Sequence, residues 1–227
     1  MKTKTARSVQ QIIESKARET KLTEAAEREK QKSRFPAITV SRQAGSEGYI
    51  VAQRIAEKHT LLFYDKEIIE AVAESAKINI AEIENLDERR FTSLDDIIAS
   101  VTQTQHLWSS DYLRHLRKVI RVIEKEGNAV IIGRGAHLIL PNTDVLRLQF
   151  IAPFEMRVKN IAKWFDRSLA EAKHLVMKID NDRQAYIKKY FNADIYDSQN
   201  YDLVINMANI TVDEAVAIVD ALLLKRQ

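Results

Sequence analysis

Five short, largely apolar stretches that alternate with helical patterns constrain the fold of this chain more than any other feature. Each stretch has the length of a β-strand: ITV (38–40), LLFY (61–64), and the apolar parts of AVIIGRGAH (129–137), DVLRLQFIAP (144–153) and YDLVINM (201–207). Strands that alternate with helices are typical of a parallel sheet with helices on both faces. The pattern therefore predicts an α/β protein built on a five-stranded parallel sheet.

Helical spacing of apolar residues fills the intervals between these strands. Helices are expected after the first two strands, at 111–126, at about 154–165, at 168–190, and from about 211 to about 225. Two of these helices begin with the spacing of a capping box, which is Ser168 with Glu171 and Thr211 with Glu214. Gly127 is a natural stop for the helix at 111–126.

The first 34 residues differ in character from the rest of the chain. They hold ten Lys or Arg and five Glu, and their few apolar residues include Val9, Ile12 and Ile13. We expect a helical arm over 5–32 that packs on the body or on a second copy, which would make a homo-oligomer. No aromatic residue precedes Phe35, which argues against a nucleic-acid-binding surface on the arm. The body is expected to span 35–227.

Composition excludes several classes of protein. With 45% hydrophobic and 30% charged residues the chain has the composition of a globular protein. It contains no cysteine, which excludes disulfides, thiol catalysis and cysteine-based zinc sites. No apolar run approaches the ~18 residues of a membrane span. The five histidines show no metal-ligand spacing, so no protein metal site is predicted. We expect no membrane association and a cytoplasmic location.

The stretch ITVSRQAGSEGYIVAQRIAE (38–57) has the strand, small turn and helix of a phosphate-binding loop. In such a loop backbone N–H groups and the helix N-terminus face the anion. A P-loop reads G-x-x-x-x-G-K-[ST], yet no lysine occurs between Ile38 and Glu57. Arg42 could supply the missing positive charge, because a guanidinium binds phosphate oxygens in pairs. The residues predicted to bind a nucleotide are Arg42, Gln43, Gly45, Ser46, Glu47, Gly48 and Tyr49.

Further polar groups stand where other strands end. They are Asp65 with Lys66, Arg134 between two glycines, and the segment after Pro153. Ligands of parallel sheets bind beyond the carboxyl ends of the strands, so these groups are expected near the same site. Asp65 could equally be a helix N-cap.

Five segments together resemble the cytidylate kinase-like family of P-loop proteins. They are the stretch at 38–57, FYDKEIIE, VIIGRGAHLIL, APFEMRVKNI and DNDRQAYIKKYFNADIYDSQNYDLVIN, and the resemblance covers about residues 36–225. It implies the fold of a nucleoside monophosphate kinase and transfer of a phosphoryl group from ATP, with Mg²⁺, to a nucleoside monophosphate. It also implies a helical acceptor-binding insert at about 75–110 and a lid at about 154–195.

The resemblance carries roles to particular residues. Arg134, Arg157 and Arg183 are the implied catalytic cations, and Asp65, Lys66 and Arg134 the implied acceptor-binding residues. The turn departs from a cytidylate kinase at four positions: Arg42 and Glu47 replace Walker glycines, Gly48 replaces the lysine, and Ile50 replaces the Ser or Thr. Gly135 replaces the aspartate of a glycine-arginine-aspartate triplet.

Three questions stay open at the sequence level. Glu47 either blocks the anion site or is favoured simply as an acid at a helix start; Arg42 either binds phosphate or pairs with a carboxylate such as Glu47. Because the lysine, the Ser or Thr and the aspartate are all replaced, the chain could also be a weak or inactive nucleotide-binding or regulatory module.

Overall fold

The computed structural model describes residues 35–65, 68, 71, 109–140 and 145–226. These residues belong to one compact unit, Phe35–Arg226. The predicted arm helix over 5–32, Lys66, and nearly all of the predicted insert at 75–110 lie outside the described residues. Within the described residues, no helix is both long enough and apolar enough to cross a membrane.

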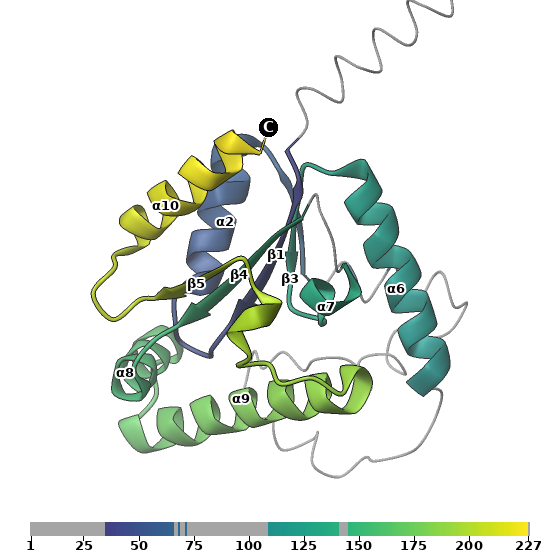
Figure 1. The fold of residues 1–227 in the computed structure, drawn as a ribbon. Helices are drawn as coiled ribbons and strands as arrows, with labels where there is room; N and C mark the ends of the chain where they lie inside the picture. The colour runs from purple at the N-terminus through teal and green to yellow at the C-terminus, as the bar shows by residue number, and fades with distance from the viewer. Residues whose placement is uncertain (1–34, 66–67, 69–70, 72–108, 141–144, 227) are drawn as a thin grey trace, which may run out of the picture. The chain divides into compact units, whose positions relative to one another are not determined.

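The described part of the chain contains one sheet of five parallel strands in the order β2-β3-β1-β4-β5 (Figure 1). β1 lies at the centre, where Ile38 is in register with Val130 of β3 and Leu146 of β4. The sheet confirms the predicted fold class. The strands are β1 (Ala37–Arg42), β2 (Leu62–Tyr64), β3 (Ala129–Ile132), β4 (Val145–Ile151) and β5 (Leu203–Asn206).

The central strands are apolar at almost every position because both faces of the sheet are covered. In β3, Val130 and Ile132 belong to one core cluster, and Ala129 and Ile131 belong to another. Successive side chains of a strand point to opposite faces, so the two clusters lie on the two sides of the sheet. Continuous apolar runs are expected in such strands.

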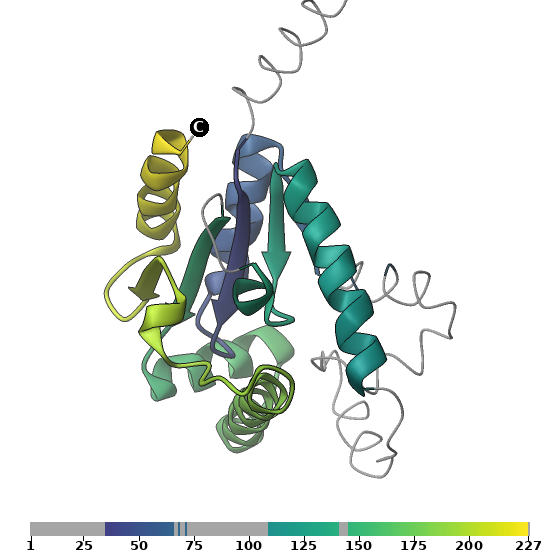
Figure 2. The ribbon, with the colours of Figure 1, turned by 45° about the vertical axis from the view of Figure 1, so that its right-hand side comes forward.

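Two helices, α2 (Gly48–His59) and α10 (Val212–Lys225), lie side by side on one face (Figures 1 and 2). Val51 of α2 and Val219 of α10 are fully buried there. The other face carries α6 (Ser109–Glu126) and the short α7 (Ala136–Ile139). Burying one Leu or Ile side chain stabilises the fold by ~1.5–3 kcal/mol, which is why these apolar stripes place the helices.

A second helix pair, α8 (Phe154–Phe165) and α9 (Leu169–Phe191), lies beyond the carboxyl ends of the strands (Figure 1). A short 3₁₀ helix, η1 (Ser198–Asn200), precedes β5. Both predicted capping boxes are present, at the start of α9 and of α10. Val158, Ile161 and Val176 of the pair form a small core with Ala44, in the turn after β1. The predicted lid region is therefore packed directly on the predicted phosphate turn.

Candidate nucleotide-binding site

The turn after β1 is tied to the neighbouring strand by Gln43. The Gln43 N–H donates to the Phe150 carbonyl oxygen at 3.0 Å, and the Gln43 side-chain oxygen accepts from the Ala152 N–H at 3.0 Å. Gln43 was expected to bind the nucleotide. In this structure its amide oxygen joins the ends of β1 and β4, which fixes where the turn begins.

Two glycines of the turn lie where a side chain does not fit. A Cβ atom on Gly45 would lie 2.4 Å from the Arg157 carbonyl oxygen, and Gly45 has a φ of +78°. A Cβ atom on Gly48 would lie 2.4 Å from the Cβ of Phe150. The resemblance aligns Gly48 with the P-loop lysine. In this structure Gly48 is in close contact with Phe150, an aromatic residue of β4.

Glu47 adopts a conformation that glycine prefers. It is the N-cap of α2 with φ 64° and ψ −2°, in the left-handed region, and its side chain makes no capping hydrogen bond. Its carbonyl oxygen accepts from the Ile50 and Val51 N–H groups at 2.9 and 3.1 Å. Glu47 therefore starts the helix through its backbone and not through a capping bond of its side chain. This leaves open both alternatives for its carboxylate, which either blocks the anion site or is favoured by the helix dipole.

Ser46 places a buried hydroxyl in the same turn. The residue is 1% exposed, and its Oγ makes no hydrogen bond within the described residues. Its N–H donates to the Gln43 carbonyl oxygen at 3.3 Å. A buried hydroxyl without an acceptor is costly, so this atom fits a bound oxygen-rich ligand such as a phosphate group.

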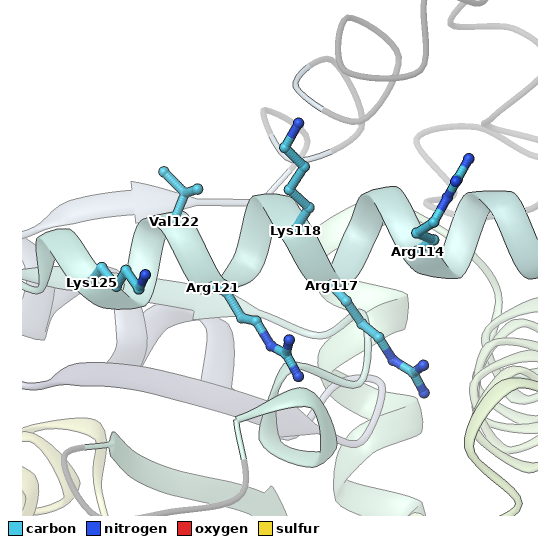
Figure 3. A pocket seen from close by; sticks show the side chains of 6 residues that line it. All are labelled: Arg114, Arg117, Lys118, Arg121, Val122 and Lys125. Carbon is cyan, nitrogen blue, oxygen red and sulfur yellow. The ribbon is translucent and has the colours of Figure 1, made fainter.

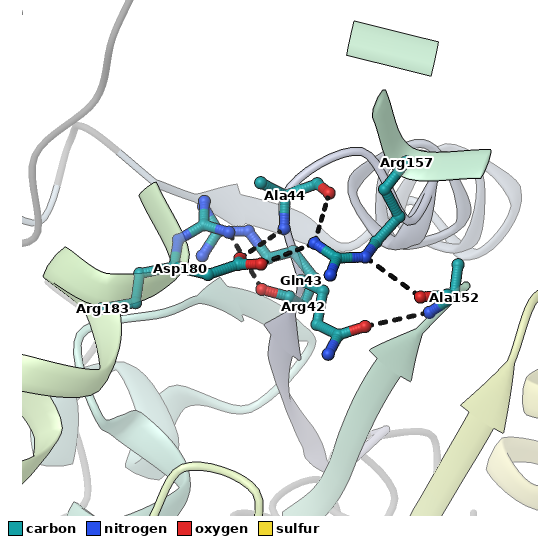
Figure 4. Close-up of polar contacts among 7 residues, drawn as sticks. All are labelled: Arg42, Gln43, Ala44, Ala152, Arg157, Asp180 and Arg183. Atoms are coloured by element: carbon teal, nitrogen blue, oxygen red, sulfur yellow. Dashed lines mark hydrogen bonds and ion pairs between the residues drawn. The ribbon is translucent and has the colours of Figure 1, made fainter. Parts of the chain in front are cut away.

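Arg157 of α8 and Asp180 of α9 clamp the turn from the side of the lid (Figure 4). The Arg157 Nη1 atom donates to Asp180 at 2.5 Å and to the Ala44 carbonyl oxygen at 3.2 Å, and its Nε donates to Ala152 at 3.0 Å. The Asp180 carboxylate also accepts from the Ala44 N–H at 2.9 Å. The predicted catalytic cation Arg157 is thus buried and holds the turn in shape. Asn160 adds a bond from its side chain to the Gly45 carbonyl oxygen at 2.9 Å.

Arg183 of α9 is another of the predicted catalytic cations. Its Nη1 donates to the Arg42 carbonyl oxygen at 2.9 Å (Figure 4), and both residues line a narrow crevice of about 10 Å³ with Tyr196. Partial burial, followed by the nearby Asp180 carboxylate, raises the pKa of the Tyr196 phenol above its ordinary value, against the opposing effect of the arginines. The phenol is therefore a neutral hydrogen-bond donor at neutral pH.

Arg134 and Asp65, both assigned to acceptor binding, are brought together. Arg134 is fully buried, and its Nη1 lies 3.5 Å from the Asp65 Oδ1, which is also buried. Arg134 has a φ of 56° between two glycines with φ of 69° and 66°. The carboxylate of Asp65 faces the arginine at the end of β3. The alternative of an N-cap at Asp65 depends on residues outside the described ones and stays open.

The position of the missing aspartate is filled by an aromatic ring. A Cβ atom on Gly135 would lie 2.3 Å from the ring of Phe191, and Gly135 has a positive φ. Phe150 thus packs on Gly48 and Phe191 packs on Gly135. These are the two glycines that the resemblance aligns with the lysine and the aspartate of a cytidylate kinase.

The turn brings together Arg42, Arg157 and Arg183, whereas Arg134 and Asp65 contact each other at the end of β3. Asp180 is a site residue that the sequence pattern does not single out, because an acid is unexpected beside an anion site. Its spacing of three residues before Arg183 on one helix was the available signal.

Known proteins with similar sequences include two cytidylate kinases. The cytidylate kinase from Pyrococcus horikoshii is 38% identical over 100 residues, which are 43% of this chain and 50% of that protein. The cytidylate kinase from Staphylothermus marinus is 24% identical over 183 residues, which are 80% of this chain and 93% of that protein. The chain thus matches only half the length of the first relative.

A solved structure and a family match complete the comparison. An uncharacterized protein from Eubacterium ventriosum shares the fold with a TM-score of 0.62 at 22% identity, over 83% of this chain and 98% of that one. Residues 37–209 match the cytidylate kinase-like family. Since this match covers more than half of the chain, with all five strands and the α8–α9 pair, the chain belongs to the cytidylate kinase-like family.

Proposed function

We propose that this protein is a phosphotransferase of nucleoside monophosphate kinase type, which converts ATP and a nucleoside monophosphate to ADP and a nucleoside diphosphate. The observation that carries the proposal is the turn from Gln43 to Glu47, which joins the central strand to α2 and contains the buried, unsatisfied hydroxyl of Ser46. Family membership and the named cytidylate kinases support a phosphotransferase. They also support cytidine monophosphate as the first acceptor to test.

The turn fits a nucleotide phosphate in its backbone and in Ser46. Within the described residues, the N–H groups of Gly45, Glu47 and Gly48 donate to no other backbone group, so they can donate to phosphate oxygens at the positive end of α2. The Ser46 hydroxyl adds a side-chain donor. These groups bind anions without a lysine.

Positioning and charge neutralisation account for most of phosphoryl-transfer catalysis. Arg183 and Arg42 line the crevice beside the turn, and we assign them the charge that the lysine supplies in a P-loop. Arg157 acts through the turn, because its guanidinium is occupied with Asp180 and Ala44. Arg134 would bind the acceptor phosphate, and Asp65 would orient that arginine.

The expected Mg²⁺ has one fewer protein ligand than in a P-loop kinase. Ile50 stands where a Ser or Thr hydroxyl would contact the metal, and Mg²⁺ readily keeps water and substrate phosphates as ligands. Bound with ATP, the metal would neutralise phosphate charge. We therefore expect ATP to bind as its magnesium complex and transfer to be slow.

A regulatory or weakly active nucleotide-binding module is the second candidate. Phe150 and Phe191 pack against the two glycines that replace the lysine and the aspartate, so two catalytic positions are closed to side chains. This favours retention of binding over retention of catalysis, because those residues act mainly on the transition state.

A pair of substitutions tests the nucleotide site without relying on catalysis. Ser46→Ala should weaken ATP binding about tenfold or more, as expected for the loss of a hydrogen bond to a charged group, worth ~1.5–3 kcal/mol. Stability should be unchanged or slightly higher, because the removed hydroxyl has no partner among the described residues. Isothermal titration with ATP, with and without Mg²⁺, and thermal unfolding measure the two effects.

Thr39→Val is the matched control. Thr39 is 2% exposed in β1, and its hydroxyl likewise makes no hydrogen bond within the described residues. It should match Ser46→Ala in stability and leave ATP affinity unchanged. Equal ATP affinity in all three proteins would refute the phosphate turn. Binding of ATP without transfer to any nucleoside monophosphate would decide for the regulatory module.

A further inference from the structure

The exposed face of α6 is a row of cations away from the nucleotide turn. Its side chains line a hollow of about 410 Å³ (Figure 3), and the described lining residues are Arg114, Arg117, Lys118, Arg121, Val122 and Lys125. The opposite side of the same helix is buried through Tyr112, Leu116 and Ile120. The core therefore anchors the helix and presents its cations to solvent.

Most of these cations have no salt-bridge partner in the described part of the chain. Arg117, Lys118, Arg121 and Lys125 form no salt bridge with any residue that the structure describes. On α2, by contrast, Arg54 pairs with Asp213 and Lys58 with Asp220. Cations four residues apart on one helix repel each other, as Arg117 and Arg121 must. An external polyanion would relieve this repulsion.

The length of the row indicates the size of that anion. Arg114 and Lys125 are eleven residues apart, which is about 16 Å along a helix that rises ~1.5 Å per residue. Every turn between them carries at least one cation. A single phosphate group or triphosphate is shorter than this row, whereas a polymer with a charge on each repeat can contact all of it.

We propose that this face of α6 binds the phosphate backbone of a nucleic acid. Nucleic acids carry their charges at regular intervals, unlike an acidic protein segment. A membrane is a poorer fit, because the apolar face of α6 is buried in the core and only Val122 is apolar on the exposed face. Contacts to phosphates carry no sequence information, so we expect binding without sequence preference. Among the described residues of α6, the aromatic side chain of Tyr112 is buried and offers bases no stacking surface.

This surface lies on the body of the protein. The earlier argument against nucleic-acid binding, from the lack of aromatic residues before Phe35, applied to the arm. The binding proposed for this surface is independent of the proposed kinase activity. It predicts an affinity that depends steeply on salt, since each neutralised phosphate releases counterions.

The test uses the full chain and a labelled single-stranded 20-nucleotide homopolymer, with affinity measured by fluorescence anisotropy over a range of salt concentrations. The variant carries Arg117→Gln, Lys118→Gln and Arg121→Gln. Its plot of log affinity against log salt should be flatter than that of the natural protein by about 2, from three charges at ~0.7 each. Its affinity at low salt should fall at least tenfold.

The control carries Lys159→Gln, Lys173→Gln and Lys225→Gln, three exposed lysines on α8, α9 and α10. It has the same net charge as the α6 variant and should bind like the natural protein. Thermal unfolding checks that both variants fold. Equal loss of affinity in the two variants, or tight binding to anionic vesicles without binding to the oligonucleotide, would overturn the proposal.

Discussion

Replacing Glu47 by glycine tests whether this residue blocks the phosphate turn. Glu47 holds φ 64° at the start of α2 without any capping bond from its side chain. A side chain in the left-handed region costs ~1–2 kcal/mol, and glycine removes this cost. Two effects lower the stability of the variant. Glycine makes the unfolded chain more flexible, which costs ~0.4–1 kcal/mol, and the loss of a negative charge at the helix N-terminus costs ~0.3–1 kcal/mol.

These contributions nearly cancel, and they leave Glu47→Gly between about 1 kcal/mol less stable and about 1.3 kcal/mol more stable than the natural protein. For a domain of this size we therefore expect a melting temperature within ~2–4 °C of that of the natural protein, in either direction. If the Glu47 carboxylate faces the bound phosphate, ATP affinity should rise about fivefold, because two like charges ~6 Å apart repel each other by ~1 kcal/mol at high effective dielectric. Calorimetric melting and isothermal titration measure the two quantities.

Glu47→Gln separates the two causes. It removes the charge and keeps a side chain in the left-handed region, so ATP affinity should rise as in Glu47→Gly while the melting temperature stays at or below that of the natural protein. If Glu47→Gly is less stable than Glu47→Gln, the backbone argument is wrong. If neither variant binds ATP more tightly, Glu47 does not oppose the phosphate.

Three further changes test the surroundings of the turn. Gly48→Lys restores a P-loop lysine but should cost ~1–3 kcal/mol in urea unfolding, because its Cβ would meet Phe150 at 2.4 Å; a stable variant with faster transfer would contradict this. Asp180→Asn should lower stability by ~1–3 kcal/mol through loss of the clamp, and an unchanged melting temperature would show that the clamp does not hold the lid. Burial raises the pKa of Asp202, but the hydrogen bonds and charge of Arg147 lower it more, so its net pKa is below the ordinary value. Its contribution to stability is therefore complete above about pH 4 and is lost as the pH falls through the lowered pKa. Asp202→Asn should therefore reduce the fall in melting temperature at acid pH. If the melting temperatures of the variant and the natural protein depend on pH in the same way, Asp202 does not contribute to acid unfolding.

Much of the fold follows from local pattern. The order of the strands, the capping boxes at Ser168 and Thr211, and the stop at Gly127 depend on neighbouring residues, and the structure confirms them. β1 is longer than predicted, because it spans Ala37–Arg42 and not only 38–40. Burial on both faces makes the strands apolar throughout, which is why the parallel sheet could be predicted. The arm and the insert stay predictions.

The sequence predicted where the candidate site lies but only some of the contacts within it. The turn, Arg157 and Arg183 come together as expected, because strand ends of a parallel sheet meet at one edge. That Arg157 is held by Asp180 and by Ala44, a residue 113 positions earlier, could not be read from spacing. Such a contact depends on how α8 and α9 pack on the turn.

By itself the sequence determined the order of strands and helices, the phosphate-type turn and the loss of its lysine, since these depend on residue type and local spacing. Only the tertiary structure decided what replaced the lost groups. Phe150 lies against Gly48 and Phe191 against Gly135, across about 100 and 56 positions of chain. Close packing permits one occupant for each space, and that occupant is set by the arrangement of β4 and α9 around the site.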